Sequence, residues 1–170
     1  MCRFSILRSI CVGLLFVAVL VGCAGGGDPV VPDQEREASS VRIFLGELVD
    51  EGDTIVVPVE FADAEDLYAF SFRVGFQQGC VEPLEVEWVS PSGEDISTFY
   101  LLDRPGFVPV AVANFTGEPG LSGNGTICRL RFRVLRRECM SPWLVDDPEY
   151  LVARDHHGRA LRMRVGGGPR

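Results

Sequence analysis

Two adjacent histidines are the side chains in this sequence best suited to metal or acid–base chemistry. His156 and His157 are the only histidines of the 170-residue chain, and they stand in an Asp-His-His-Gly run typical of a turn. Zinc needs ligands that converge on one point, whereas neighbouring residues on a turn diverge. We therefore expect an exposed turn here and no metal site.

Short acidic clusters bind calcium when their spacing supplies a full set of oxygen ligands. Two clusters occur, the first made of Asp50, Glu51 and Asp53, the second of Asp63, Glu65 and Asp66. Neither has the spacing of a calcium loop, so both predict solvated turns. The sequence also lacks the Gly-x-Ser-x-Gly, His-Glu-x-x-His, phosphate-binding and dinucleotide-binding motifs. It predicts a non-enzyme without metal or cofactor.

The charged residues argue against nucleic acid as a partner. All 16 basic residues are arginine, and they face 24 acids, for a net charge of −8. The distribution is uneven: residues 42–103 hold 14 acids and 2 arginines, whereas residues 104–170 hold 6 acids and 11 arginines. The two halves of the chain thus carry opposite net charges, an asymmetry that calls for an explanation.

The N-terminus has the layout of a secretory signal, with Arg3 and Arg8 ahead of an apolar run over residues 10–21 that is short for a membrane span. The run ends in Leu-Val-Gly-Cys at Cys23, which resembles the lipobox of bacterial lipoproteins. The resemblance implies a signal peptide over residues 1–22, cleavage before Cys23 and acylation of that cysteine. The alternative is an uncleaved anchor. By the same resemblance, the non-acidic Ala24 favours the outer membrane within the cell envelope.

The residues after the lipobox predict a tether followed by one domain. Residues 23–40 are rich in glycine, proline and acids and show no sustained period, as in a flexible linker. The remaining length suits one domain with its own core, which we expect over residues 41–167, with a tail over residues 168–170.

The stretch 52–76 predicts two antiparallel strands, because apolar residues alternate with polar or small ones. One face of the first strand carries Ile55, Val57, Val59 and Phe61, and one face of the second carries Tyr68, Phe70, Phe72, Val74 and Phe76. Pro58 predicts that the first of these strands is an edge strand or a bulged one. The run of large apolar groups on the second strand must bury against another layer, which predicts a sandwich.

Further alternating segments predict strands at residues 41–45, 84–89, 98–102, 107–115, 126–134 and 159–165. Their expected inward residues include Leu84, Val86 and Trp88; Val108, Val110 and Val112; Cys128, Leu130, Phe132 and Val134; and Ala160 or Leu161 with Met163. No segment of helical period reaches the length of a stable helix. The sequence thus predicts an all-β sandwich of about eight or nine strands.

Four motifs together resemble the cohesin family. They are GDTIVVPVEF, LYAFSFRVGF followed by LEVEWV, GNGTICRLRFRV and the closing DHHGRALRMRVGGG, and they span residues 41–166. The resemblance implies a jelly-roll sandwich. Cohesins of cellulosomes bind calcium-loaded dockerin modules, and cohesin-like domains also occur singly in bacteria without a cellulosome. Because the chain carries one such module and no dockerin or catalytic domain, binding is the function that the resemblance implies.

With Cys23 acylated, three cysteines of the mature chain remain in an oxidising compartment, which predicts one pair and one free thiol. Cys128 is in phase with buried Leu130 and is interpreted as a small hydrophobe. We therefore expect a disulfide between Cys80 and Cys139.

The phase of two strands also predicts a partner-binding face. If Phe72 and Leu130 point inward, then Arg73, Arg129, Arg131 and Arg133 point outward. In cohesins the corresponding strands are taken to be neighbours in the sheet that docks dockerin, so the resemblance would place these arginines together. Arginine favours carboxylate or phosphate, which predicts an acidic protein segment, such as a dockerin-like partner, or an anionic envelope polymer. The alternative is a solvated face neutralised by the carboxylates of the N-terminal half.

Two other functions remain open from the sequence. A carbohydrate-binding module of the same shape would use exposed aromatics, for which Trp88, Tyr100 and Trp143 are candidates, although Trp88 is in phase with the core. A polysaccharide would then be the ligand. A structural envelope lipoprotein would have no dedicated binding face.

Overall fold

The computed structural model describes residues 40–89, 96–114 and 119–166, and almost every described element is a strand. The strands are β1 (Ser40–Leu45), β2 (Val49–Asp50), β3 (Thr54–Leu67), β4 (Ala69–Gly75), β5 (Val81–Trp88), β6 (Ile96–Tyr100), β7 (Phe107–Asn114), β8 (Leu121–Val134), β9 (Trp143–Leu144), β10 (Val152–Arg154) and β11 (Ala160–Val165). A 3₁₀ turn, η1 (Arg137–Cys139), follows β8. Within these ranges no helix has the length and apolarity to cross a membrane.

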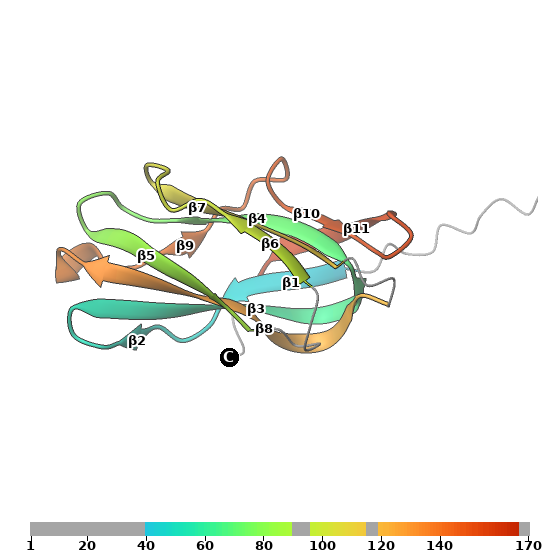
Figure 1. Ribbon diagram of the computed structural model, residues 1–170, viewed down its shortest axis with the longest axis horizontal. Coiled ribbons are helices and arrows are strands. Elements are labelled where there is room, and N and C mark those ends of the chain that lie inside the picture. The colour runs from blue at the N-terminus through green and yellow to red at the C-terminus, as the bar shows by residue number, and fades with distance from the viewer. Residues whose placement is uncertain (1–39, 90–95, 115–118, 167–170) are drawn as a thin grey trace, which may run out of the picture. The chain divides into compact units, whose positions relative to one another are not determined.

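The strands form two packed layers (Figure 1). One layer, the β8 sheet, has the order β5-β8-β3-β1 with β2 paired to β3, and the other, the β4 sheet, has the order β10-β4-β7-β6 with β9 paired to β4. Strand β11 pairs in parallel with β1 and antiparallel with β10, so it joins the layers along one edge. At the opposite edge β5 and β6 end the two sheets. The predicted all-β jelly-roll sandwich is confirmed.

The core lies between the layers and is built by the predicted alternation. Ile55, Val57, Val59 and Phe61 of β3 are buried, as are Phe70, Phe72 and Val74 of β4, Val108, Val110 and Val112 of β7, and Cys128, Leu130 and Phe132 of β8. Each of these sets points to one side because successive side chains of a strand alternate. Tyr68, which lies just before β4, is half-buried instead of buried.

Strands β3 and β8 form the longest pairing, and its irregularities shape the molecule. The register shifts between Val59 and Glu60, between Phe61 and Ala64, and between Ala64 and Leu67. Pro58 therefore lies in an interior strand just before a bulge, so of the two alternatives for this strand the bulged one is correct. The same shift turns Ile127 inward, where only 4% of its surface is exposed, although strict alternation had placed it outside.

The segment after η1 contains two short strands that the sequence analysis did not predict. β9 pairs with the end of β4, and β10 pairs with its beginning. Prolines at positions 142 and 148 obscure any period there, and strands of two or three residues are too short to show one. These strands complete the β4 sheet.

Candidate interaction surfaces

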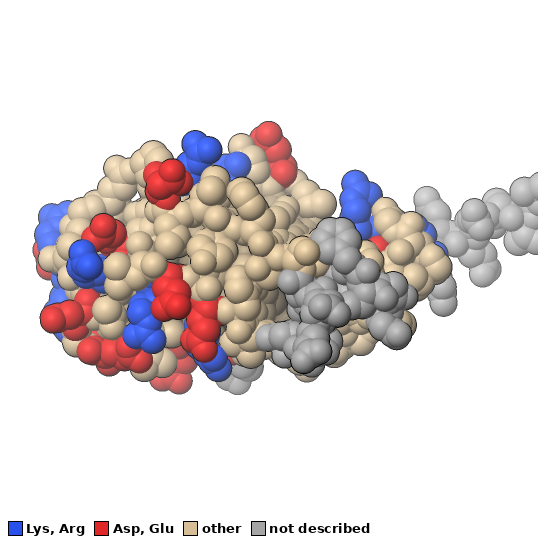
Figure 2. Space-filling view, in the orientation of Figure 1, with Lys and Arg blue, Asp and Glu red and all other residues tan. Residues whose placement is uncertain are grey.

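The outer side of the β8 sheet is a ladder of ion pairs. Arg129, Arg131 and Arg133 stand at alternate positions of β8, opposite the acids Glu87, Glu85 and Glu82 of β5. Their guanidinium groups lie 3.4 Å from Glu87, 2.5 Å from Glu51 and 3.1 Å from Glu82, respectively. Each arginine thus has a carboxylate of the N-terminal half beside it. Figure 2 shows the resulting mixture of blue and red side chains at the left end of the molecule.

Arg73 does not belong to this surface, and the prediction that it shares a face with the three arginines of β8 is wrong. It lies on β4, whose neighbours are β7, β9 and β10, whereas β8 pairs with β3 and β5 in the other layer. Both strands point their apolar faces into one core, so their polar faces point to opposite sides of the sandwich. Alternation fixes which residues of a strand point outward, but it does not say in which layer the strand lies.

The outer side of the β4 sheet, here named the β4 face, has a different chemistry. Directly paired residues of antiparallel strands point to the same side, so the pairing defines its members. They are Ala69, Ser71 and Arg73 of β4; Phe107, Pro109, Ala111 and Ala113 of β7; Ser97 and Phe99 of β6; Val152 and Arg154 of β10; and Trp143 of β9. None of these side chains is acidic, and most are small or apolar.

Several large apolar groups of the β4 face are open to solvent. Phe99 exposes 57% of its surface, Trp143 49% and Val152 39%. The small side chains between them, such as Ser71 and Ala111, are half-buried, and the Ser71 hydroxyl donates to the Tyr150 carbonyl at 3.5 Å. A patch without acids and with protruding apolar groups is typical of a protein-binding surface.

Arg73 is held in place on the β4 face by aromatic rings. Its guanidinium carbon lies 3.2 Å from the centre of the Tyr150 ring and 4.6 Å from that of the Phe107 ring. Cation–π contact of this kind orients the side chain without neutralising its charge. No carboxylate forms an ion pair with Arg73 in the described part of the chain. Arg73 is thus oriented by the two rings and is half-exposed.

The three candidate carbohydrate-binding aromatics do not form one row. Trp88 of β5 and Tyr100 of β6 pack together across the open edge of the sandwich, with ring centres 6.3 Å apart. Trp88 is half-buried and packs against the core, and its indole N–H has no partner among the described residues. Trp143 lies on β9, on the other side of β4 and β7, with its ring over Gly75. A flat platform of these three rings is therefore absent.

His156 and His157 lie in the exposed turn between β10 and β11, as predicted. The imidazole Nδ1 of His156 contacts the Asp66 carboxylate, which also accepts a hydrogen bond from the backbone N–H of Gly120 at 2.6 Å. Burial raises the pKa of Asp66, but the hydrogen bonds from Gly120 and His156 outweigh it and lower the pKa overall. In the described residues no three acidic, histidine or cysteine side chains are grouped to hold a metal ion.

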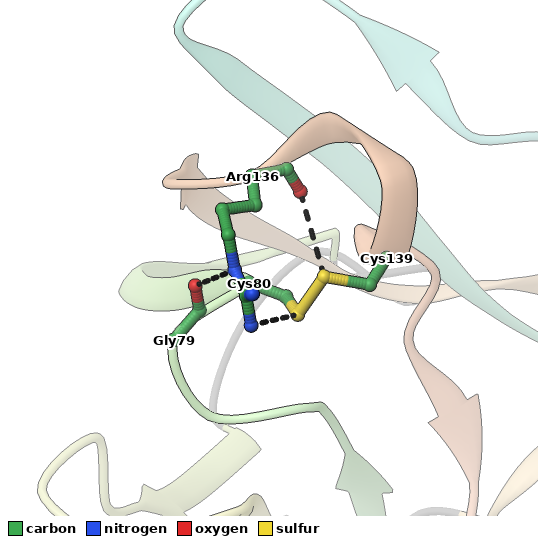
Figure 3. Close-up of a disulfide and its surroundings, with 4 residues drawn as sticks. All are labelled: Gly79, Cys80, Arg136 and Cys139. Carbon is green, nitrogen blue, oxygen red and sulfur yellow. Dashed lines mark hydrogen bonds between the residues drawn. A yellow bond between two sulfur atoms is a disulfide. The ribbon is translucent and has the colours of Figure 1, made fainter.

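The structure pairs Cys80 with Cys139, the disulfide expected from the sequence (Figure 3). Cys80 lies in the turn between β4 and β5, where the chain crosses from one layer to the other, and its carbonyl accepts hydrogen bonds from the N–H groups of Leu135 and Arg136. Arg136 also donates from Nε to the Gly79 carbonyl at 3.0 Å. The disulfide thereby fixes η1 to the crossing. Cys128 is a buried free thiol, also as expected.

No protein-family model matches the sequence, and no curated protein matches it. Solved structures do match in fold. A cohesin, CaCohA2, solved in complex with a variant of CaDoc0917, has a TM-score of 0.65 at 18% identity, covering 75% of this chain and 96% of the other. A non-cellulosomal cohesin from the archaeon Archaeoglobus fulgidus has a TM-score of 0.58 at 18% identity, with coverages of 75% and 88%.

A third match is a type II cohesin domain from the cellulosome of Acetivibrio cellulolyticus, with a TM-score of 0.59 at 14% identity, covering 78% of this chain and 92% of the other. At such low identity the matches show the fold but do not identify the ligand. The two layers, the strand pairing and these similarities agree that this chain has the jelly-roll fold of cohesin domains.

Proposed function

We propose that this protein is a non-enzymatic protein-binding module displayed at the bacterial cell envelope, and that it binds its partner through the β4 face. The observation that carries the proposal is the contrast between the two outer surfaces. On the β8 sheet the arginines of the central strand have carboxylates beside them, whereas the β4 face exposes Phe99, Trp143 and Val152 around small side chains.

The partner class follows from the chemistry of the β4 face. Its exposed apolar groups suit an apolar patch on the partner, and Arg73 and Arg154 without an acid among the face residues suit a carboxylate. Cohesin structures similar to this one were solved in complex with dockerins, one of them the Cel5 dockerin. A dockerin-like module with an acidic residue near its apolar contact surface is therefore the partner that we propose.

Capture of a partner tests this proposal. The purified full-length chain in detergent is immobilised and exposed to dockerin modules, and bound protein is quantified. Ala111→Glu places a charge in the middle of the β4 face, where Ala111 pairs with Ser71 and Phe99. We expect it to reduce binding at least tenfold, because a buried unpaired carboxylate costs more than about 1.4 kcal/mol.

The matched control is Thr54→Glu, which adds the same side chain at a half-exposed position of the β8 sheet, opposite Arg133. It should leave binding unchanged, as should Arg131→Glu. Loss of binding in the control variants but not in Ala111→Glu would move the site to the arginines of β8. If the unmodified chain binds no dockerin, the proposed partner class is wrong. The alternative of a structural envelope lipoprotein would then be favoured.

The membrane anchor is a second part of the proposal, supported by the Leu-Val-Gly-Cys run at Cys23, which lies outside the described residues. We propose that acylated Cys23 attaches the chain to the membrane, with residues 24–40 as a tether and the outer membrane as its location. Radiolabelled palmitate should enter the unmodified chain and be absent from Cys23→Ala. Label that persists in the variant would contradict the anchor without bearing on the β4 face.

A further inference from the structure

A polar pocket lies on the β8 sheet, away from the β4 face and from the ion pairs of β8. It has a volume of about 400 Å³ and opens between β1, β3 and the beginning of β8. Its polar rim is made by Arg42, Glu60, Asp63, Asn124 and Thr126, and the buried ring of Phe44 contributes to its floor. The volume exceeds that of one hexose ring, and the pocket is partly open to solvent.

Irregular backbone creates this pocket. Two register shifts of β3 against β8 flank Glu60 and Phe61, which pair with Thr126 and Gly125, and the second shift leaves Ala62 and Asp63 without a strand-pairing partner on β8. Asp63 has a φ of 59°, a left-handed conformation that is uncommon outside glycine. Bulges are over-represented at sheet edges and next to active sites, and backbone outliers cluster at ligand sites.

The rim side chains are held by one another. The Asp63 carboxylate accepts a hydrogen bond from Arg42 Nε at 2.7 Å, and its backbone N–H donates to Asn124 Oδ1 at 3.0 Å. The amide nitrogen of Asn124 and the terminal nitrogens of Arg42 are then left as donors. Glu60 lies over Gly46, where an added Cβ would stand 2.8 Å from its Oε1. The pocket lining therefore offers both hydrogen-bond donors and acceptors.

The balance of charge decides which ligand class fits. One arginine and two carboxylates line the pocket, which disfavours a phosphate or carboxylate ligand. A divalent cation is also disfavoured, because one of the two carboxylates is paired with Arg42 and no third acid joins them in the described residues. A sugar hydroxyl donates and accepts at once, so adjacent hydroxyls match a lining that offers both kinds of group. We propose that this pocket binds a neutral hexose unit of a glycan.

Calorimetric titration of the full-length chain tests the proposal, in a detergent without a sugar headgroup. The probes are neutral gluco-, xylo- and manno-oligosaccharides, with inorganic phosphate and calcium as the other ligand classes. We expect saturable binding of at least one neutral oligosaccharide and none of phosphate or calcium. Asn124→Asp keeps the acceptor for the Asp63 N–H but replaces the donor, and it should weaken binding about tenfold, the cost of one lost hydrogen bond with a desolvated partner.

Two further variants keep the test decisive. Thr126→Val removes a rim hydroxyl at nearly constant shape and should also weaken binding, while Arg131→Ala breaks an exposed ion pair of the same sheet outside the pocket and should not. Circular dichroism checks that each variant folds. The proposal is overturned if no neutral oligosaccharide binds or if phosphate or calcium binds instead. It is also overturned if neither rim variant changes the affinity for the oligosaccharide. Because the pocket and the β4 face are on different sheets, these results do not depend on the proposed protein binding.

Discussion

Asp155 is the only buried charged side chain among the described residues, with 4% of its surface exposed. Its Oδ1 accepts hydrogen bonds from the backbone N–H groups of His157 and Arg159, and its Oδ2 accepts one from Arg159 Nε at 2.6 Å. Burial raises its pKa, but the hydrogen bonds and charge of Arg159 outweigh burial and lower the pKa overall. The carboxylate thus orders the turn between β10 and β11.

We expect Asp155→Asn to lower the free energy of unfolding by about 2 kcal/mol at pH 7, because charge-assisted hydrogen bonds are lost. A carboxyl group with a lowered pKa in the folded state stabilises above its unfolded pKa, and this contribution is lost as the pH falls through the folded pKa. The difference between the two proteins should therefore shrink on acidification. Urea titrations from pH 7 to pH 3 measure it.

The matched control for this prediction is Asp147→Asn. Asp147 also accepts a backbone N–H, that of Glu149, but has no arginine partner among the described residues. Its substitution should cost less at pH 7, because no charge-assisted pair with an arginine is lost. An equal effect of the two substitutions would mean that the Arg159 pair contributes nothing.

Cys128 gives a second prediction at the scale of single residues. Burial raises the pKa of its thiol to about 12, and none of its surface is exposed. Because the thiolate is the reactive form, iodoacetamide at pH 8 should label Cys128 only after denaturation. Mass spectrometry of tryptic peptides measures the labelling. Rapid labelling of the native protein would show that β8 opens locally.

The ion-pair ladder of β8 makes a prediction at the scale of elements. Arg131→Glu would place a carboxylate beside Glu51 and opposite Glu85. Exposed pairs contribute little, so we expect a loss of about 1 kcal/mol at low salt. In 1 M salt the loss should be smaller, because exposed charges are screened. Thermal unfolding at both salt concentrations measures the change, and a loss that does not depend on salt would indicate a packing defect.

The sequence could predict where most strands lie and which face of each is buried, but it could not predict which strands pair with one another. Alternation predicted the buried faces of β3, β4, β7 and β8, because each strand presents one side to a single core. It missed the inward turn of Ile127, since a bulge depends on the pairing with β3. The layer to which Arg73 belongs also depends on long-range pairing, as does the stacking of Arg73 on Tyr150. The β4 face and the polar pocket also depend on which strands pair, so alternation in the sequence alone could not predict them.

At the scale of the whole molecule, one covalent link closes a large loop. The disulfide joins residues 59 positions apart and holds the crossing between the layers against η1. In the chain-entropy model a loop of that length raises the free energy of unfolding by about 4 kcal/mol. We expect the Cys80→Ala/Cys139→Ala variant to lose stability by this order, measured by urea denaturation.

The same titration with reductant provides the control for that prediction. Reduction should destabilise the unmodified protein and leave the double variant unaffected. A double variant as stable as the unmodified protein would mean that the residues around Cys80 hold the crossing without the covalent bond. The hydrogen bonds from Leu135 and Arg136 to the Cys80 carbonyl would then be sufficient.

The position of β1 determines how the domain would respond to mechanical force. β1 is the first strand of the described residues, and it is hydrogen-bonded along both edges, in parallel to β11 and antiparallel to β3. A force applied at Ser40 along the axis of β1 would load the bonds on both edges together in shear. β1 would then resist detachment until the two rows of bonds rupture at once.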